Sequence, residues 1–439
     1  MSTIVLSNVD RLRTNISYVA WGPLVNVARR LVQGFLNRIE IGQLVVEEHG
    51  ESIVYGSRNL VVGSPPFPVT TLKIVSDTFW LRVAAFSDMG LAESYMLGEF
   101  ECPDLTTFFR IFIMNREQLS NGLTWTSAIS SKISGLLAPL NSLSNSQLHI
   151  SAHYDLSNEM FASFLSPDMT YSCPIWQTSR PGKSIDQTLH DAQLRKLDYI
   201  ADQARIKQSD HVLEIGTGWG SFAIRAVQRF GCRVTSLTLS KEQKELAESR
   251  IADAGLSDRI EVLLCDYRLH NGTYDKVVSI EMLEAVGREY LDTYFWCIDK
   301  FLRKTGGIAV FQCITIPEAR YEAYSRSQDF IRRYIFPGGH LPCVTQLVDS
   351  ITRGSKGGLI VENIYNIGPH YARTLREWRH NFLANYDTFR PRDDPEVFKR
   401  KWVYYFTYCE AGFNTKTLGD HIITVSREGA LEQLEGIPL

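Results

Sequence analysis

The chain has 439 residues, of which 44% are hydrophobic and 22% are charged, as in ordinary folded globular proteins. This length exceeds one ordinary core, so we expect two or three domains. The formal net charge of −3 argues against a dedicated nucleic-acid binder. The eight cysteines form no C-x-x-C pair, which predicts no metal site and favours a reduced, cytoplasmic compartment over a disulfide framework.

The apolar segments of the sequence indicate neither a secretory signal nor a membrane-spanning helix. Met1 to Thr14 contains Asp10, Arg11 and Arg13 and has no apolar stretch, so we expect no secretory signal. No uncharged apolar window reaches about 18 residues, so we expect no membrane-spanning helix. Any membrane contact should therefore be peripheral.

Residues 1–120 are predicted to form an N-terminal α+β domain. Its apolar surface could line a lipid groove, which would make the domain lipid-associated, or could form a plain core of helices on a sheet. The predicted elements, in chain order, are an amphipathic helix over Pro23–Leu36, strands within Gln43–Tyr55 and over Val69–Ile74, and helices over Asp77–Phe86 and Leu105–Ile113.

Residues 121–147 are rich in Ser, Asn and Gly and poor in charge, which predicts a linker before a catalytic domain at 148–439. In that domain, Asn158–Leu165 and Ile185–Ala204 are predicted helices. Between them Tyr171, Ser172 and Cys173 lie on an irregular segment, where ligand contacts are common. Cys173 could be a nucleophile or a packing thiol.

The stretch Val212–Gly220 (VLEIGTGWG) is a buried apolar run that ends in glycines. It predicts a parallel strand from His211 to Ile215, a tight turn where the backbone approaches a ligand, and a helix over Phe222–Phe230. Ser221 stands where a dinucleotide-binding turn would have its third glycine, and no acid lies near Ser236. The turn is thus unlike a nicotinamide site, and an ordinary strand-to-helix turn stays open as an alternative.

Strands and helices continue to alternate after this turn. This order predicts a doubly wound, Rossmann-like α/β sheet, with ligands outside the carboxyl ends of the strands. Gly216, Leu239, Asp266 and Glu281 all fall at such ends. The further predicted elements are strands Arg233–Leu239, Ile260–Leu264, Tyr274–Ile280 and Ile308–Ile316, and helices Lys241–Ala254 (with a capping box of Ser240 and Gln243) and Tyr290–Leu302.

Several motifs together resemble one family. The glycine turn, Thr238-Leu239-Ser240-x-x-Gln243 and Asp266-Tyr267-Arg268 resemble class I S-adenosylmethionine (SAM) methyltransferases. HYDLS (153–157), YSCPIW (171–176), IFPGGHLP (335–342), YCEAGF (408–413) and GLAESYMLGEF (90–100) resemble, more narrowly, the cyclopropane-fatty-acyl-phospholipid synthase family, in its plant- and fungal-like branch. The resemblance covers nearly the whole chain.

The resemblance implies methyl transfer from SAM to a cis double bond of an unsaturated phospholipid acyl chain, then proton loss and closure of a cyclopropane ring. It implies a bicarbonate ion as the base. Two alternatives stay open: a related lipid C-methyltransferase with a methyl-branched or methylene product, and a lipid-binding protein whose catalytic machinery has decayed.

Residue by residue, the resemblance implies a bicarbonate cage of Cys173 and Ile314 through backbone groups and Glu284, Gln312 and Tyr371 through side chains. The best-known bacterial pattern has His in place of Gln312 and Glu-His in place of Glu284-Ala285. Gln can donate a hydrogen bond but cannot titrate, so it fits an orienting role. Glu284 as a helix cap and Tyr371 as a core tyrosine are the simpler alternatives.

The resemblance also implies residues that bind SAM, and it points to one cysteine as a candidate nucleophile. Cys409 matches a position proposed as a nucleophile, although methyl transfer to an alkene needs no covalent enzyme intermediate. The residues implied for SAM binding are Tyr171, Ser172, Gly216, Gly218, Gly220, Thr238, Leu239, Gln243, Asp266 and Tyr267.

Between Ala372 and Trp402, basic residues alternate with aromatic ones, which suits an anionic bilayer surface or, more simply, a solvated helix face. The resulting prediction is a cytoplasmic, peripherally membrane-associated enzyme. Family resemblance adds a homodimer as a further candidate. The residues concerned are Arg373, Arg376, Arg379, Arg390, Arg392, Lys399, Arg400 and Lys401, with Trp378, Phe382, Phe389, Phe398 and Trp402.

Overall fold

The computed structural model describes residues 18–57, 68–120, 157–178, 186–391 and 394–438. The chain divides into two compact units. Unit 1 comprises 1–155, 329–335 and 386–415, and unit 2 comprises 156–328, 336–385 and 416–439. The predicted linker at 121–147 lies outside the described residues, and the predicted domain limits stay predictions.

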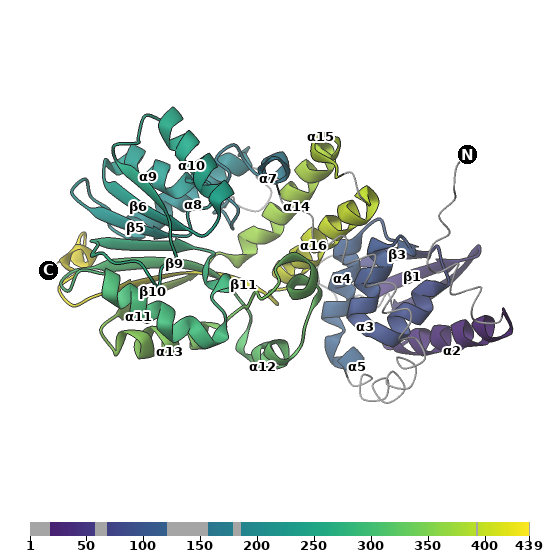
Figure 1. Ribbon diagram of the computed structural model, residues 1–439. Helices are drawn as coiled ribbons and strands as arrows, with labels where there is room; N and C mark the ends of the chain where they lie inside the picture. The colour runs from purple at the N-terminus through teal and green to yellow at the C-terminus, as the bar shows by residue number, and fades with distance from the viewer. Residues whose placement is uncertain (1–17, 58–67, 121–156, 179–185, 392–393, 439) are drawn as a thin grey trace. The chain divides into compact units, whose positions relative to one another are not determined.

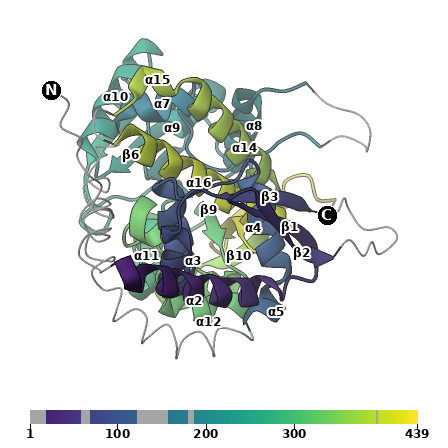
Figure 2. The same cartoon turned by 90° about the vertical axis from the view of Figure 1, so that its right-hand side faces the viewer.

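Unit 1 contains a four-stranded sheet in the order β2-β1-β3-β4. The strands β1 and β2 form an antiparallel hairpin, and β3 runs parallel to β1. Figure 2 shows this sheet beside the helices of the same unit. The elements are α2 (Tyr18–Leu36), β1 (Gly42–Glu48), β2 (Glu51–Ser57), β3 (Val69–Ile74), α3 (Thr78–Met96), β4 (Phe100–Glu101), α4 (Leu105–Met114), α5 (Arg116–Ser120), η3 (Ile331–Ile335), α15 (Tyr386–Phe389) and α16 (Pro395–Asn414).

Late segments of the chain join unit 1 through packing and buried charges. Helix α16 packs against α3 and α4. Arg82 on α3 pairs with Glu99 at 2.9 Å and with Glu93 at 3.5 Å, and the Tyr334 hydroxyl donates to Glu93 at 2.7 Å. Buried charges need such partners, because an unpaired one would strongly destabilise the fold. The helix predicted over Asp77–Phe86 ends at a kink at Ser87 (φ 53°), and α3 resumes after this kink up to Met96, a stretch that the sequence analysis did not assign.

Unit 2 is a seven-stranded sheet in the order β10-β11-β9-β8-β5-β6-β7. The neighbouring strands β9, β8, β5, β6 and β7 run parallel to one another. Strand β11 pairs antiparallel with both β9 and β10. This arrangement confirms the predicted Rossmann-like sheet and adds two C-terminal strands that the sequence analysis did not assign. The strands are β5 (His211–Ile215), β6 (Arg233–Thr238), β7 (Ile260–Leu264), β8 (Lys276–Ile280), β9 (Ile308–Thr315), β10 (Ile360–Asn366) and β11 (Gly419–Ser426).

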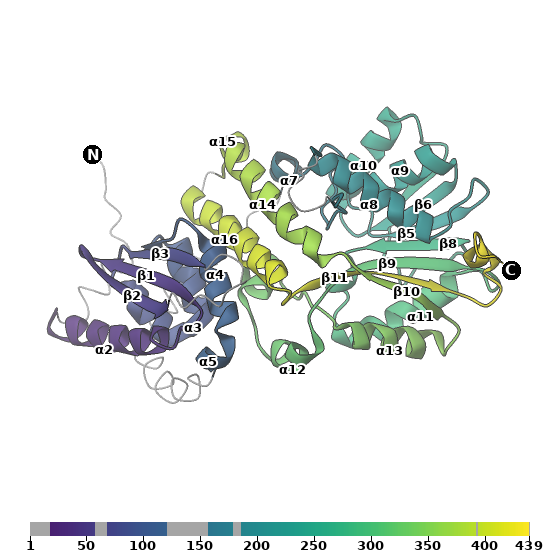
Figure 3. The same cartoon turned by 180° about the vertical axis from the view of Figure 1, so that it is seen from behind.

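Helices cover both faces of this sheet (Figures 1 and 3), with α8, α9 and α10 on one side and α11 and α13 on the other. The helices of the unit are α7 (Asn158–Phe164), α8 (Leu189–Gln203), α9 (Ser221–Phe230), α10 (Lys241–Asp253), η1 (Leu283–Ala285), η2 (Arg288–Tyr290), α11 (Leu291–Phe301), α12 (Glu318–Arg326), α13 (Val344–Ser355), α14 (Gly368–Ala384) and η4 (Leu431–Leu434).

Helix α8 and strand β8 begin later than predicted for local reasons, and the predicted capping box at α10 is incomplete. Helix α8 begins after Thr188, whose side chain forms a capping box with Asp191. Strand β8 begins at Lys276, because Tyr274 makes only an isolated bridge to Leu302. At α10, Ser240 accepts from the Gln243 N–H, but the Gln243 side chain does not complete the box.

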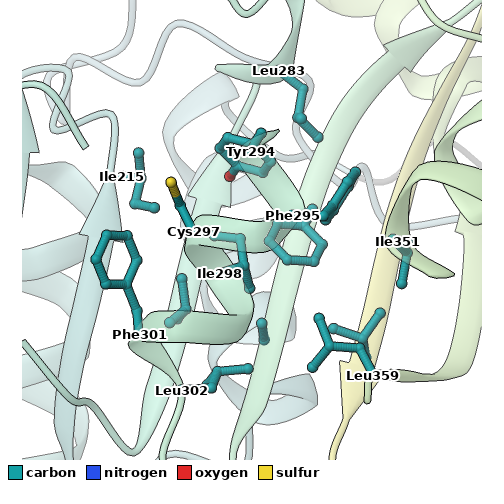
Figure 4. Packing of buried hydrophobic residues seen from close by; sticks show 14 of the residues in the cluster. Ile215, Leu283, Tyr294, Phe295, Cys297, Ile298, Phe301, Leu302, Ile351 and Leu359 are labelled. Carbon is teal, nitrogen blue, oxygen red and sulfur yellow. The ribbon is translucent and has the colours of Figure 1, made fainter. Parts of the chain in front are cut away.

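The core of unit 2 lies between the sheet and the α11/α13 layer. Phe295, Ile298 and Phe301 on α11 are at most 1% exposed and belong to a cluster with Ile215 and Ile351 (Figure 4). Within the described residues, no helix is both long and apolar enough to cross a bilayer.

We expect Phe295→Ala to lower the free energy of unfolding by about 3–5 kcal/mol, because it removes a buried ring and leaves a cavity. The neighbouring Trp296 is 49% exposed, so Trp296→Ala is the matched control, with an expected loss below about 1 kcal/mol. Urea unfolding curves measure both. Equal losses would mean that α11 does not pack as described.

Candidate active site

The glycine turn after β5 is held in a conformation that only glycine adopts readily. Gly216, Gly218 and Gly220 have φ values of 97°, 52° and 85°. The Gly216 and Thr217 N–H groups donate to the Leu237 carbonyl at 2.9 and 3.1 Å, which fixes the turn to β6. A Cβ on Gly218 would meet no protein atom within 4 Å, so this backbone borders open space. The turn therefore has room for a ligand.

The irregular segment before α8 packs on this turn. The Trp219 indole donates to Asn158 at 2.8 Å, and its ring lies 5.0 Å from Phe161. Phe161 in turn contacts Tyr171 at 5.1 Å between ring centroids. The Ser172 hydroxyl lies 2.5 Å from the Lys196 ammonium group on α8. Tyr171 is thus linked through side chains to the glycine turn, and Ser172 is linked to α8.

The other residues predicted for SAM follow β6 and β7. The Thr238 hydroxyl donates to the Gln243 side chain at 2.9 Å, and Leu239 is 73% exposed. Asp266 pairs with Arg268 at 2.5 Å, and this ion pair lowers the pKa of Asp266. The Tyr267 ring packs edge-on against Tyr294 at 5.3 Å. These groups follow two adjacent strands of the same sheet edge as the glycine turn.

A single carboxylate collects three of the five groups that were predicted to hold bicarbonate. The Cys173 N–H and the Gln312 amide donate to Glu281 Oε1 at 2.7 and 2.8 Å. The Tyr371 hydroxyl donates to Glu281 Oε2 at 2.7 Å. The expected donors are therefore near one another, but they surround a side chain of the protein. A bicarbonate ion does not fit among them while Glu281 keeps these contacts.

The remaining two groups pair with each other. The Ile314 N–H donates to Glu284 Oε1 at 2.5 Å, and Glu284 Oε2 is buried without a partner in the described structure. Burial and the charge of Glu281 raise the pKa of Glu284 to about 8. The alternative that Glu284 caps the helix that follows it is not observed, because Glu284 lies inside η1 and neither η2 nor α11 has a side-chain cap. Its carbonyl accepts from the His340 N–H at 2.8 Å, which joins the IFPGGHLP motif to the cluster.

Three functional candidates were missed in the sequence. Glu281 was noted only as a strand end, although an acid directly after a buried parallel strand is a signal. Asp420 on β11 is fully buried and accepts from the Gln312 amide at 3.0 Å, while burial and the Glu281 charge raise its pKa well above the usual range. Lys196 is fully buried, and burial lowers its pKa. No local sequence pattern marks Asp420 or Lys196 as a functional residue.

The surroundings of Cys173 and Cys409 bear on whether either thiol could act as a nucleophile. Cys173 is fully buried, and burial together with the charge of Asp420 raises its pKa well above that of an ordinary thiol. These conditions favour the packing interpretation, since the thiolate is the nucleophilic form. Cys409 lies on α16 in unit 1, where burial and the charge of Asp329 raise its pKa. Its catalytic role stays a prediction.

The basic and aromatic stretch from 372 to 402 does not present its aromatic side chains as a surface. Trp378, Phe382, Phe398 and Trp402 are at most 3% exposed. These four side chains therefore stabilise the core, whereas Phe389 is half-buried, so the stretch does not present a row of exposed aromatic rings. Peripheral membrane association stays a prediction.

Comparison with known proteins agrees with this architecture. Residues 141–421 match the family model described as "Mycolic acid cyclopropane synthetase". The chain belongs to this family of SAM-dependent methyltransferases. The predicted resemblance to cyclopropane synthases is thereby confirmed.

Individual relatives cover most of the chain. The tuberculostearic acid methyltransferase UfaA1 of Mycobacterium tuberculosis is 40% identical over 356 residues, which is 80% of this chain and 82% of that protein. The cyclopropane-fatty-acyl-phospholipid synthase of Escherichia coli K12 is 33% identical over 357 residues, or 81% of this chain and 87% of that protein. The solved structure of mycolic acid cyclopropane synthase CmaA1 with SAH and CTAB has a TM-score of 0.56 at 29% identity, covering 63% of this chain and 97% of that one.

We expect Gly218→Ala to weaken SAM binding by at least about tenfold, because a methyl group would enter the open space beside the turn. Gly255→Ala is the matched control, since Gly255 also has a positive φ (69°) and no neighbour within 4 Å of an added Cβ. Both variants should lose similar stability from backbone strain. Calorimetric titration with SAM separates the two effects, and equal SAM affinities would exclude the turn from the site.

Glu214 on β5 provides a pH prediction. Burial raises its pKa from 4.5 to about 8, so the folded protein keeps a proton that the unfolded chain releases. The free energy of unfolding should then fall as pH rises from about 4.5 to about 8, by up to about 1.4 kcal/mol per pH unit for this group. Glu214→Gln should flatten this slope, whereas Glu245→Gln on the exposed face of α10 should not. Urea unfolding across pH 5–8 measures both slopes, and unchanged slopes would contradict the prediction.

Proposed function

We propose that the protein transfers a methylene group from SAM to the cis double bond of an unsaturated phospholipid acyl chain and forms a cyclopropane fatty acyl chain. The observation that carries this proposal is the hydrogen-bonded carboxylate cluster around Glu281, next to a glycine turn, in a chain of this family. SAM supplies an electrophilic methyl group when it is bound. The residues Tyr171, Ser172, Gly216, Gly218, Gly220, Thr238, Leu239, Gln243, Asp266 and Tyr267 would hold it.

Proximity supports a common site for the two reactants. The Met282 side chain would lie 3.2 Å from a Cβ on Gly216, and Met282 directly follows Glu281. The Ser279 hydroxyl donates to the Ile215 carbonyl at 3.0 Å, so the ends of β8 and β5 are fixed to each other. An alkene is a weak nucleophile and must be held in line with the methyl group, which requires this kind of rigid support.

Aromatic rings support the stabilisation of a cationic intermediate. Trp378 lies 5.1 Å from Tyr171 and 5.7 Å from Tyr371 between ring centroids, and Phe336 lies 6.4 Å from Tyr171. The faces of such rings attract positive charge in a desolvated site. Buried carboxylates beside them would add to this stabilisation. These aromatic rings and carboxylates are therefore suited to surround an acyl chain that becomes cationic after methylation.

A second product is favoured by one observation. The relative UfaA1, named a tuberculostearic acid methyltransferase, is 40% identical to this chain. The alternative proposal is thus a SAM-dependent lipid C-methyltransferase with a methyl-branched or methylene product. The decayed-enzyme alternative has less support, because Glu284, Tyr371 and the glycines of the turn are all present. Peripheral membrane contact and a homodimer stay predictions, and no catalytic step here depends on them.

Incubation of the purified protein with SAM and vesicles of cis-monounsaturated phospholipid should give acyl chains that are heavier by one methylene group and contain no olefin. Mass spectrometry detects the gain, and proton NMR distinguishes a cyclopropane from a vinylidene or methyl-branch signal. Saturated phospholipid vesicles are the control, because they offer no double bond. A branch signal would establish the alternative product, and no gain with several unsaturated lipids would overturn both.

A further inference from the structure

We propose that the Glu281 carboxylate, and not a bound bicarbonate ion, accepts the proton that the methylated acyl chain must lose. This inference rests on the proposed function and deepens it. Its starting point is the set of donors that were expected to hold an external anion. In the structure these donors hold Glu281, so the protein supplies the anion from its own chain.

The contacts define an acceptor site of fixed orientation. Oε1 accepts from the Cys173 backbone and the Gln312 amide, and Oε2 accepts from the Tyr371 hydroxyl. All three partners donate, which matches an ionised carboxylate because that group can only accept. Hydrogen bonds at both oxygens also make the carboxylate a weaker nucleophile, which reduces the risk that it is methylated itself. Its partners Cys173, Gln312 and Tyr371 are at most 4% exposed, whereas Glu281 is only half-buried and can be reached by a ligand.

The backbone at Glu281 is strained in a way that keeps this orientation. Its φ is 46°, in the left-handed region that non-glycine residues seldom adopt. Its N–H donates to the Gln312 carbonyl at 2.8 Å, so Glu281 and Gln312 are joined through both backbone and side chains. Such strain costs about 1–3 kcal/mol and is found mainly at functional sites. The surrounding contacts thus fix a conformation that directs the carboxylate towards its three donors.

Neighbouring charges can accommodate a proton on Glu281. Asp420 lies beside it, fully buried, and shares the Gln312 amide as a donor. Two adjacent carboxylates, of which Asp420 is fully buried, favour sharing a proton over carrying two negative charges. The buried Lys196 supplies a positive charge that interacts with both. Uptake of one proton therefore leaves a cluster that still has hydrogen-bonding partners for each acid.

The step is balanced by the following transfers. The π electrons of the alkene form a bond to the methyl carbon, the bond from sulfur to that carbon breaks, and sulfur keeps the electron pair. The acyl chain then carries a positive charge on the former alkene carbon beside the one that bears the new methyl group. Glu281 takes a proton from this methyl group, and the released C–H electron pair forms the last carbon–carbon bond of the ring. Gln312 and Tyr371 orient the carboxylate and do not themselves transfer the proton.

The test compares bicarbonate binding and turnover in the wild type, Glu281→Gly and Glu281→Gln, with Glu245→Gln as the control. Glycine tolerates the positive φ, so Glu281→Gly should fold and bind SAM with unchanged affinity. It also empties the space among the three donors. Carbon-13 NMR titration should show saturable bicarbonate binding by Glu281→Gly and none by the wild type or Glu245→Gln.

Turnover is measured with and without dissolved carbon dioxide. Wild-type turnover should be the same in both buffers, and both Glu281 variants should lose at least about 100-fold. Bicarbonate should restore part of the Glu281→Gly turnover and none of the Glu281→Gln turnover. Bicarbonate binding to the wild type, or loss of wild-type turnover without carbon dioxide, would overturn the inference. If the wild type converts no lipid, the proposed function fails, whereas the binding titration still decides whether Glu281 occupies the anion position.

Discussion

Convergence of hydrogen-bond donors on one half-buried carboxylate is the constraint on which the site depends. Glu281 follows β8, and its side chain contacts β9 through Gln312, α14 through Tyr371 and the segment before α8 through Cys173. Removal of the carboxylate would leave these buried donors without this partner, and a buried unsatisfied group costs about 1–3 kcal/mol. One side chain therefore links four parts of unit 2 that are distant in sequence.

Electrostatics explain why so many acids can share this small region. Burial disfavours charge on Glu284 and Asp420, and the charge of Glu281 raises the pKa of both. The buried Lys196 supplies an opposite charge. A region with more acids than bases can stay folded when some of the acids keep their protons. The same arrangement places proton acceptors beside a site for a reactive methyl group, which connects the stability of the cluster to its proposed chemistry.

The parallel sheet makes this possible, because it gathers the carboxyl ends of several strands at one edge. The glycine turn follows β5, Glu281 follows β8, and Gln312 lies near the end of β9. The antiparallel strand β11 then adds Asp420 beside Gln312. The glycine turn and the carboxylate cluster thus lie at the same edge of the sheet, although their residues span more than half of unit 2 in sequence.

The sequence by itself determined the strands β5 to β9, the glycine turn and the family, because burial period, glycine positions and local motifs are short-range signals. It also named Cys173, Glu284, Gln312, Ile314 and Tyr371 through resemblance. Only the tertiary structure decided what these groups contact. Glu281 as their common partner, Asp420 from an unassigned strand and Lys196 from a helix depend on side chains that meet across the sheet. These side-chain contacts follow from strand order and packing, which no local sequence pattern predicts.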